Sequence, residues 1–412
     1  MLQKTEIFLV VLVIVGTFGI HQYTQRAAAT EITSVYGTIA NQEVLRDDAP
    51  LTDEEFAIIE NCSTEVVGSR NVAEECMRGF YDDYTMKHGG DKAFAHLARL
   101  QKEHPNLLPS CHYISHGIGH AMLRLGGNDP FKAFSFLEQH EVFKNVITCG
   151  NGYFHGVIEE LAKDTRDKDA LIALLRPVCA NNQIQNRGNC YHGVGHAAMI
   201  QTEYNIPDTL YICDHISAKP EESFGCHTGA FMEHAQVHDD DVSVVDRKMK
   251  FLVCDAQEPK HQAACYLEHS SHFESFSSDP LNYTRNIGFC KQIENQVNRM
   301  ACIKLFAIRA VRIARYPDVR EMCLNTSSRY ERVMCTAVMA DRIAGSADKN
   351  RTSEAYHASV RNICATMNPV FAEQCEYLVR EGGKRLFYTS EEDLQFSTPT
   401  ELQLEAKVLE LL

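Results

Sequence analysis

Three short segments of the chain place a histidine four residues before a second histidine or a glutamate. They read His116-Gly-Ile-Gly-His120, His155-Gly-Val-Ile-Glu159 and His192-Gly-Val-Gly-His196. Side chains four residues apart stack on one face of an α-helix, so each segment offers two ligands on one side. His/His and His/Glu pairs at this spacing are a common metal-binding arrangement. The pattern predicts a metal site built from His116, His120, His155, Glu159, His192 and His196.

Imidazole and carboxylate ligands favour zinc, with copper and iron as alternatives. If one coordination position stays open, the ion could activate water or bind oxygen, with Glu159 as a ligand or as the general base. The competing interpretation is a buried, hydrogen-bonded histidine ladder that packs the helices. Further histidines and an acid lie off the common face, and we expect them to be surface or core residues: His227, Glu233, His234, His269 and His272.

The sequence contains none of the common catalytic, nucleotide-binding or haem-binding motifs that we considered. HExxH, GxSxG, P-loop, GxGxxG and CxxCH motifs are all missing, so whether the protein is an enzyme stays open. A formal net charge of −15 disfavours nucleic acid as a partner. A protein or a small molecule of unknown identity remains as the partner.

The three segments must lie on equivalent helices if their side chains are to meet. Each follows a cysteine by a few residues: Cys111, Cys149 or Cys190. Counted from that cysteine at about 100° per residue, the six side chains fall within an arc of about 140°. Glycines beside the histidines predict close approach of the helix backbones, although Gly-Asn-Gly after Cys149 could delay the start of that helix.

The chain has sixteen cysteines, and their spacing indicates an internal sequence repeat. Seven pairs lie 11 to 14 residues apart: Cys62/Cys76, Cys179/Cys190, Cys213/Cys226, Cys254/Cys265, Cys290/Cys302, Cys323/Cys335 and Cys364/Cys375. The second members, together with Cys111 and Cys149, recur about every 37 residues, which indicates about nine helical-hairpin repeats. Cys111 and Cys149 either bond to each other or stay free as thiol ligands beside the histidines.

Apolar residues at helical spacing flank each cysteine pair, and polar turn-forming residues lie between its members. Each unit is therefore expected to run helix, cysteine, loop, cysteine, helix, with the second cysteine opening the second helix. A disulfide across so short a loop stabilises the unit by about 2–3 kcal/mol. The predicted fold is all-α: a disulfide-stapled helical-hairpin repeat, arranged as a solenoid or a closed toroid.

This period and disulfide placement resemble the secreted, cysteine-rich Sel1-like and tetratricopeptide-like α/α repeat proteins. The resemblance implies a concave binding surface without intrinsic catalysis, although the tetratricopeptide Trp/Leu/Gly/Tyr signature is missing and the chain has no Trp. A local similarity to lanthionine cyclases, zinc-binding helical toroids, rests on Cys-Tyr-His-Gly at Cys190. Pairing of Cys190 in a disulfide would remove it as a ligand. A secreted repeat scaffold for a protein or peptide partner, with structural histidines, is thus the alternative function.

The chain divides into five segments. Residues 1–29 contain an apolar core, Ile7 to Ile20, and are expected to be a signal peptide or an N-terminal anchor. A linker at 30–50 precedes histidine-rich repeats at 51–245, repeats without the motif at 246–387, and a tail at 388–412 with a short amphipathic helix. We expect a secreted protein, or one anchored to the outer face of a membrane, and only such an anchor would contact the membrane. Four N-x-S/T sequons are compatible with glycosylation: Asn61, Asn282, Asn325 and Asn350.

Overall fold

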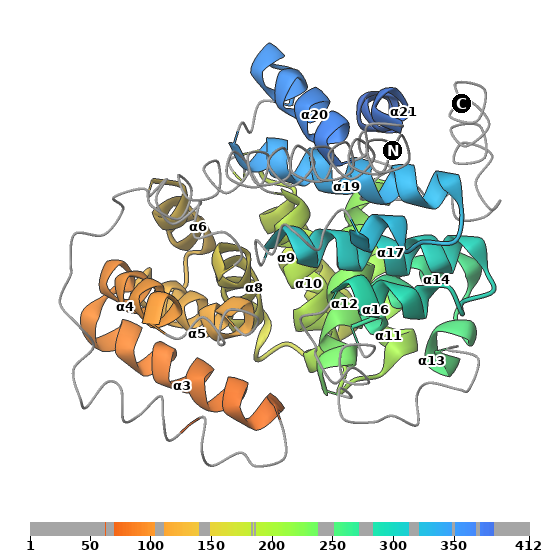
Figure 1. Ribbon diagram of the computed structural model, residues 1–412. Coiled ribbons are helices and arrows are strands. Elements are labelled where there is room, and N and C mark those ends of the chain that lie inside the picture. Colours follow the sequence, from red (N-terminus) through yellow and green to blue (C-terminus); the bar gives the residue numbers. More distant parts are fainter. Residues whose placement is uncertain are drawn as a thin grey trace, which may run out of the picture.

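The described part of the chain is all-α. The computed structural model describes residues 62, 70–103, 111–139, 149–182, 184, 187–237, 251–271, 283–312, 321–347, 351–367 and 371–382. These residues form helices and turns with no β-strand among them, which confirms the predicted fold class (Figure 1). The predicted signal or anchor at 1–29, the linker at 30–50 and the tail at 388–412 lie outside the described residues.

One series of helices packs each member against the next along the chain, from the orange end to the blue end of Figure 1. This inner series is α3 (Arg70–His88), α5 (Cys111–Leu125), α8 (Cys149–Ala162), α10 (Arg187–Gln201), α12 (Pro220–Val237), α14 (Pro259–His269), α17 (Gln296–Arg312) and α19 (Arg329–Ala347). Consecutive packing of this kind brings residues about 40 positions apart into contact.

The remaining helices connect members of the inner series and pack on their flanks. They are α4 (Gly90–Glu103), α6 (Pro130–Gln139), α9 (Lys168–Cys179), α11 (Ile206–Ile216), α13 (Leu252–Asp255), α16 (Tyr283–Cys290) and α20 (Glu354–Met367). After α20, α21 (Ala372–Tyr377) runs into a π-helical turn at Leu378–Gly382. Buried apolar side chains form an N-terminal and a C-terminal cluster, and the two clusters meet at α11 and α12.

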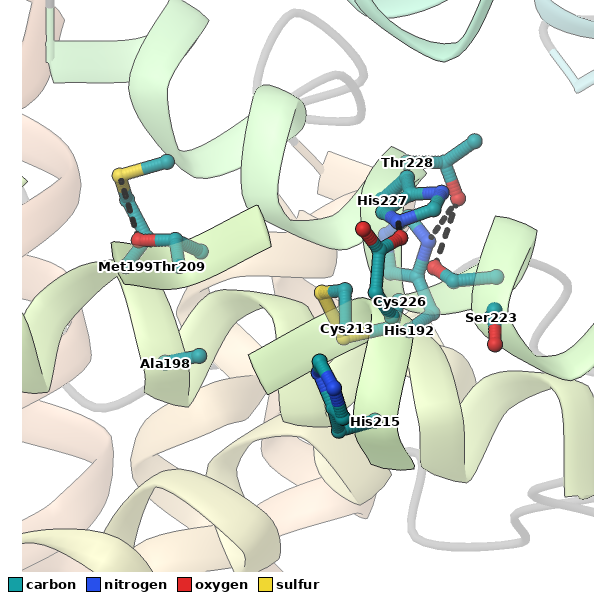
Figure 2. The surroundings of a disulfide bond; sticks show 12 residues. His192, Ala198, Met199, Thr209, Cys213, His215, Ser223, Cys226, His227 and Thr228 are labelled. Atoms are coloured by element: carbon teal, nitrogen blue, oxygen red, sulfur yellow. Dashed lines mark hydrogen bonds and ion pairs between the residues drawn. A yellow bond between two sulfur atoms is a disulfide. The ribbon is translucent and has the colours of Figure 1, made fainter. Parts of the chain in front are cut away.

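All seven predicted cysteine pairs are disulfide-bonded, with Cα–Cα distances between 5.3 and 5.8 Å. The Cys213–Cys226 bond, for example, joins α11 to α12 (Figure 2). Cys111 is also disulfide-bonded, and no cysteine of the described residues is free. The expectation that Cys111 could remain a thiol ligand is therefore excluded, while the side chain of Cys149 lies outside the described residues.

α5 begins at its cysteine as the sequence indicated, but two later helices of the series begin earlier than expected. α12 begins at Pro220, six residues before Cys226, and α14 begins at Pro259, six residues before Cys265. Proline is favoured in the first turn of a helix because its missing N–H has no partner there, so these prolines start the helix inside the expected loop. Gly-Asn-Gly after Cys149 does not delay the next helix, since α8 begins at Cys149 itself.

Backbone-to-backbone contact between the inner helices depends on glycine. A Cβ atom added to Gly156 of α8 would lie 2.0 Å from the carbonyl oxygen of His116 in α5, and one on Gly119 would lie 2.2 Å from the oxygen of Tyr153. Between α10 and α12, a Cβ atom added to Gly195 would lie 2.0 Å from the carbonyl oxygen of Cys226. The predicted close approach at the glycines is confirmed, because no other residue fits at these distances.

Disulfides in this number are typical of proteins from oxidising compartments outside the cytoplasm. None of the described helices is long and apolar enough to cross a membrane. Among the four sequons, only Asn325 is described, and its side-chain Nδ2 donates a hydrogen bond to the carbonyl of Thr284 at 2.7 Å. A glycan on Asn325 would have to replace this hydrogen bond.

Substituting Gly156 by alanine should strongly destabilise the protein. The added methyl group overlaps the His116 carbonyl, which is backbone and cannot rotate away, so we expect a loss of about 3 kcal/mol in unfolding free energy. Gly79→Ala in α3 is the matched control, because a Cβ there meets nothing within 4 Å. The control should gain up to about 1 kcal/mol from helix propensity. Urea denaturation measures both, and equal effects of the two substitutions would contradict the contact.

Candidate metal centre

The six predicted site residues meet where α5, α8 and α10 pack together. His116 and His120 come from α5, His155 and Glu159 from α8, and His192 and His196 from α10. The ring centroid of His155 lies 5.4 Å from that of His116, 4.8 Å from that of His192 and 4.9 Å from that of His196. Four of the six side chains, those of His116, His155, His192 and His196, therefore lie together in one group of rings.

His155 stands at the centre of the group. Its side chain is 1% exposed, and neither ring nitrogen has a hydrogen-bond partner among the described residues. Burial, followed by the neighbouring rings of His192 and His112, holds the pKa of His155 well below its usual value, so the ring is neutral at pH 7. A buried imidazole without a partner is costly, because the polar nitrogens lose water and gain nothing in return.

Glu159 orients His116 and His120 from α8. The Nδ1 atom of His116 lies 2.9 Å from one carboxylate oxygen and 3.1 Å from the other, and Nε2 of His120 lies 3.1 Å away. Burial raises the pKa of Glu159, but its contacts with His116 and then His120 outweigh burial and hold that pKa well below its usual value. The ionised carboxylate therefore accepts the Nδ1–H of His116, whose own pKa is lowered, chiefly by burial.

Glu233 of α12 orients His196 as Glu159 orients His116. Its carboxylate accepts a hydrogen bond from Nδ1 of His196 at 2.9 Å, and Tyr204 donates to its other oxygen at 3.2 Å. Burial opposes protonation of His196, but the hydrogen bond and charge of Glu233 outweigh it, together with the charge of Glu159, and raise the pKa of His196. A carboxylate in this position also strengthens the other ring nitrogen as a donor to a cation.

The tautomer of His192 is fixed by a hydroxyl group. The Thr228 hydroxyl donates its only proton to the carbonyl of Gly225 at 2.8 Å. Its oxygen lies 2.9 Å from Nδ1 of His192 (Figure 2), and while the hydroxyl donates to Gly225 this oxygen accepts the Nδ1–H. In their neutral forms, His116, His192 and His196 thus carry their proton on Nδ1 and present an Nε2 lone pair. Of these, Nε2 of His116 and of His196 are buried without a hydrogen-bond partner among the described residues.

Sequence reasoning missed His112 and misplaced Glu233. His112 lies one residue after Cys111 in α5, and its ring centroid is 4.8 Å from that of His155. The expectation that Glu233 lies apart from the site was wrong, because counting from Cys226 ignored the register set by glycine. α8 and α12 share a Gly-x-x-x-Gly-x-x-x-Glu pattern that ends at Glu160 and Glu233 respectively, one residue beyond the position of Glu159 in α8.

His120 lies outside the central group of rings. It is on the far side of the Glu159 carboxylate, with Nδ1 4.0 Å from the carboxylate of Asp82 in α3. Arg78 of α3 also approaches Glu159, at 4.0 Å, and stacks over the ring of Tyr113. Charged and aromatic side chains from α3 therefore border the Glu159 side of the centre.

Three sets of ligand atoms in this region are close enough to hold a metal ion, with every pair of atoms within 4.8 Å. They are His112/His116/His155, His155/His192/His196 and Glu159/His196/Glu233. Cys190 is bonded to Cys179, so the sulfur ligation suggested by the local similarity to lanthionine cyclases is excluded.

A separate cluster lies between α11, α12 and α14. The Oδ1 atom of Asp214 lies 2.8 Å from Nε2 of His227 and 3.1 Å from Nε2 of His261. Lys260 donates to the other Asp214 oxygen at 3.0 Å. The three groups could hold a cation, but the Lys260 ammonium already occupies one carboxylate oxygen. His234 and His269 pair with each other in α12 and α14, 3.2 Å apart.

Comparison with known proteins identifies no relative of the chain. No protein-family model, no curated protein and no solved structure matches the chain. The chemistry of the centre therefore has to be inferred from its own residues.

Replacing His155 by leucine should flatten the acid dependence of stability in the metal-free protein. A ring whose pKa is lowered on folding stays neutral below about pH 6.5, whereas the unfolded chain gains a proton there. The unfolding free energy of the parent must therefore fall as pH falls from about 6.5, by up to about 1.4 kcal/mol per pH unit for one such group.

His155→Leu should lose this part of the slope in urea denaturation of chelator-treated protein between about pH 6.5 and 5. Val157→Ala, in the same buried helix, is the control, because it lowers stability without removing a titrating group. Parallel slopes for the parent and the leucine variant would contradict burial of a neutral His155.

Proposed function

We propose that the protein is an extracytoplasmic, metal-binding α-repeat protein whose centre is built from the histidines of α5, α8 and α10. The ligands are His112, His116, His155, His192 and His196. The wider proposal places this centre in the first half of a solenoid of about nine disulfide-stapled repeats. Consecutive packing of the inner helices and the local disulfides support that arrangement.

The observation that carries the proposal is the environment of His155. A fully buried imidazole with two unpartnered nitrogens gains nothing from a histidine ladder, because a ladder is held by hydrogen bonds. Four further imidazole rings surround it, with centroids between 4.8 and 5.4 Å away. A transition-metal ion would use these lone pairs directly.

The groups behind the ligands support the same conclusion. Histidines that bind metals typically donate their second ring N–H to a carboxylate or another oxygen, which fixes the ring and raises its basicity. Glu159 does this for His116, Glu233 for His196 and Thr228 for His192. Because the Glu159 oxygens already contact two histidines, we assign Glu159 to orienting ligands rather than to the role of general base.

Zinc is the ion we propose first. Neutral imidazole ligands and a tetrahedral preference suit Zn²⁺, and Cu²⁺ accepts the same donors. Iron would require carboxylate ligation, for which the Glu159/His196/Glu233 set is the available group. Three imidazole ligands leave a fourth position for water or a small molecule, which is how a centre of this kind would act catalytically.

The alternative is a secreted repeat scaffold with structural histidines, as the Sel1-like resemblance implies. A scaffold needs no convergence of the histidines, and it does not explain why a neutral, unpartnered His155 is buried among four others. We therefore propose that the repeats provide the framework of the protein and that its specific function belongs to the metal centre.

Metal analysis of the full-length secreted chain tests the proposal. Protein purified without chelators should contain at least one equivalent of a transition metal by plasma mass spectrometry. A His116→Ala/His196→Ala variant should lose most of it, because one ring is removed from each histidine set. His215→Ala, which removes an exposed histidine of α11, is the matched control and should keep the parent's metal.

Circular dichroism and a free-thiol count on the same samples establish that each variant is folded and oxidised. Metal-free parent protein that also fails to take up Zn²⁺, Cu²⁺ or Fe²⁺ would overturn the proposal. Equal metal in the double variant and the parent would place the ion elsewhere.

A further inference from the structure

We propose that the centre holds two metal ions that share His155 as a bridging ligand. This inference rests on the proposed function and specifies its composition. One ion would lie in the set His112/His116/His155, and the other in the set His155/His192/His196. His155 is the only residue common to these two sets.

The two half-sites are built alike. Each has two histidines four residues apart on one helix: His112 and His116 on α5, and His192 and His196 on α10. In each, the second histidine donates Nδ1–H to a glutamate from the following inner helix, Glu159 of α8 or Glu233 of α12. Such duplication would be redundant for one ion, whereas for two it supplies each ion with two histidines of one helix and a glutamate behind one of them.

His155 has the properties that a bridge requires. It comes from the helix between α5 and α10, and its ring centroid lies within 5.4 Å of all four other rings. Both of its nitrogens are buried and unpartnered among the described residues, so one is available to each half-site. The other histidines with fixed tautomers have a single lone pair, because hydrogen bonds hold Nδ1–H of His116, His192 and His196.

Binding of both ions releases one proton from His155. A neutral imidazole binds the first ion through its unprotonated nitrogen. Binding the second ion replaces the remaining N–H proton, which leaves to solvent, and His155 becomes an imidazolate. The first ion assists this loss by withdrawing charge from the ring. The Glu159 and Glu233 carboxylates, one behind each half-site, partly compensate the added positive charge.

Stoichiometry with Zn²⁺ alone as the probe tests the inference on the full-length oxidised chain. The chelator-stripped parent should bind two equivalents. His112→Ala and His192→Ala, which each remove one unshared ring, should each bind one, and His215→Ala should still bind two. One equivalent in the parent, lost to the same extent in both half-site variants, overturns the two-ion centre and leaves the proposed function standing. No binding in the folded parent overturns both.

A spectroscopic measurement on the parent tests the bridge without any substitution. Two Cu²⁺ ions joined by an imidazolate couple magnetically, so the integrated electron paramagnetic resonance signal of the doubly loaded protein should fall well below its copper content. Each half-site variant with one Cu²⁺ should give its full signal. Two bound Cu²⁺ ions with a full, uncoupled signal would show separate sites and overturn the bridge.

Discussion

Close contact between helix backbones is the constraint on which the centre depends. Helices packed through ordinary side chains lie about 8–10 Å apart, whereas these helices meet backbone to backbone at their glycines. Gly119 and Gly156 bring α5 onto α8, and a Cβ atom on Gly193 of α10 would lie 3.1 Å from the Cα atom of His155 in α8. Glycine inside a helix lowers its intrinsic stability, so the chain gives up local stability to bring three helices within reach of one buried ring.

The oxygen atoms behind the rings determine what the rings can do. An imidazole presents either a donor or a lone pair at a given nitrogen, and burial alone does not select between them. Glu159, Thr228 and Glu233 each take the Nδ1 proton of one histidine, so the Nε2 lone pairs are oriented before any ion arrives. Preorganisation of this kind avoids reordering the ligands at the moment of binding.

The sequence predicted most of this arrangement because its strongest signals are local. Cysteines 11 to 14 residues apart can only bridge neighbouring helix ends, and a four-residue histidine spacing identifies one helical face without reference to the fold. Glu233 was beyond that reasoning for a physical reason. Its position depends on where α12 begins and how neighbouring helices are aligned at their glycines, and a helix start counted from a cysteine does not record either quantity. His112, by contrast, lies four residues before His116 and could have been found by the same spacing.

The short span of the disulfides also bears on how the chain is made. Seven of the disulfides in the described residues join cysteines no more than 14 positions apart, so the two partners of each leave the ribosome almost together. In an oxidising compartment each of these pairs can be linked early, before a cysteine from a later part of the chain offers a wrong partner. Disulfide isomerases, which long-range pairings often require, would have little to correct in such a chain.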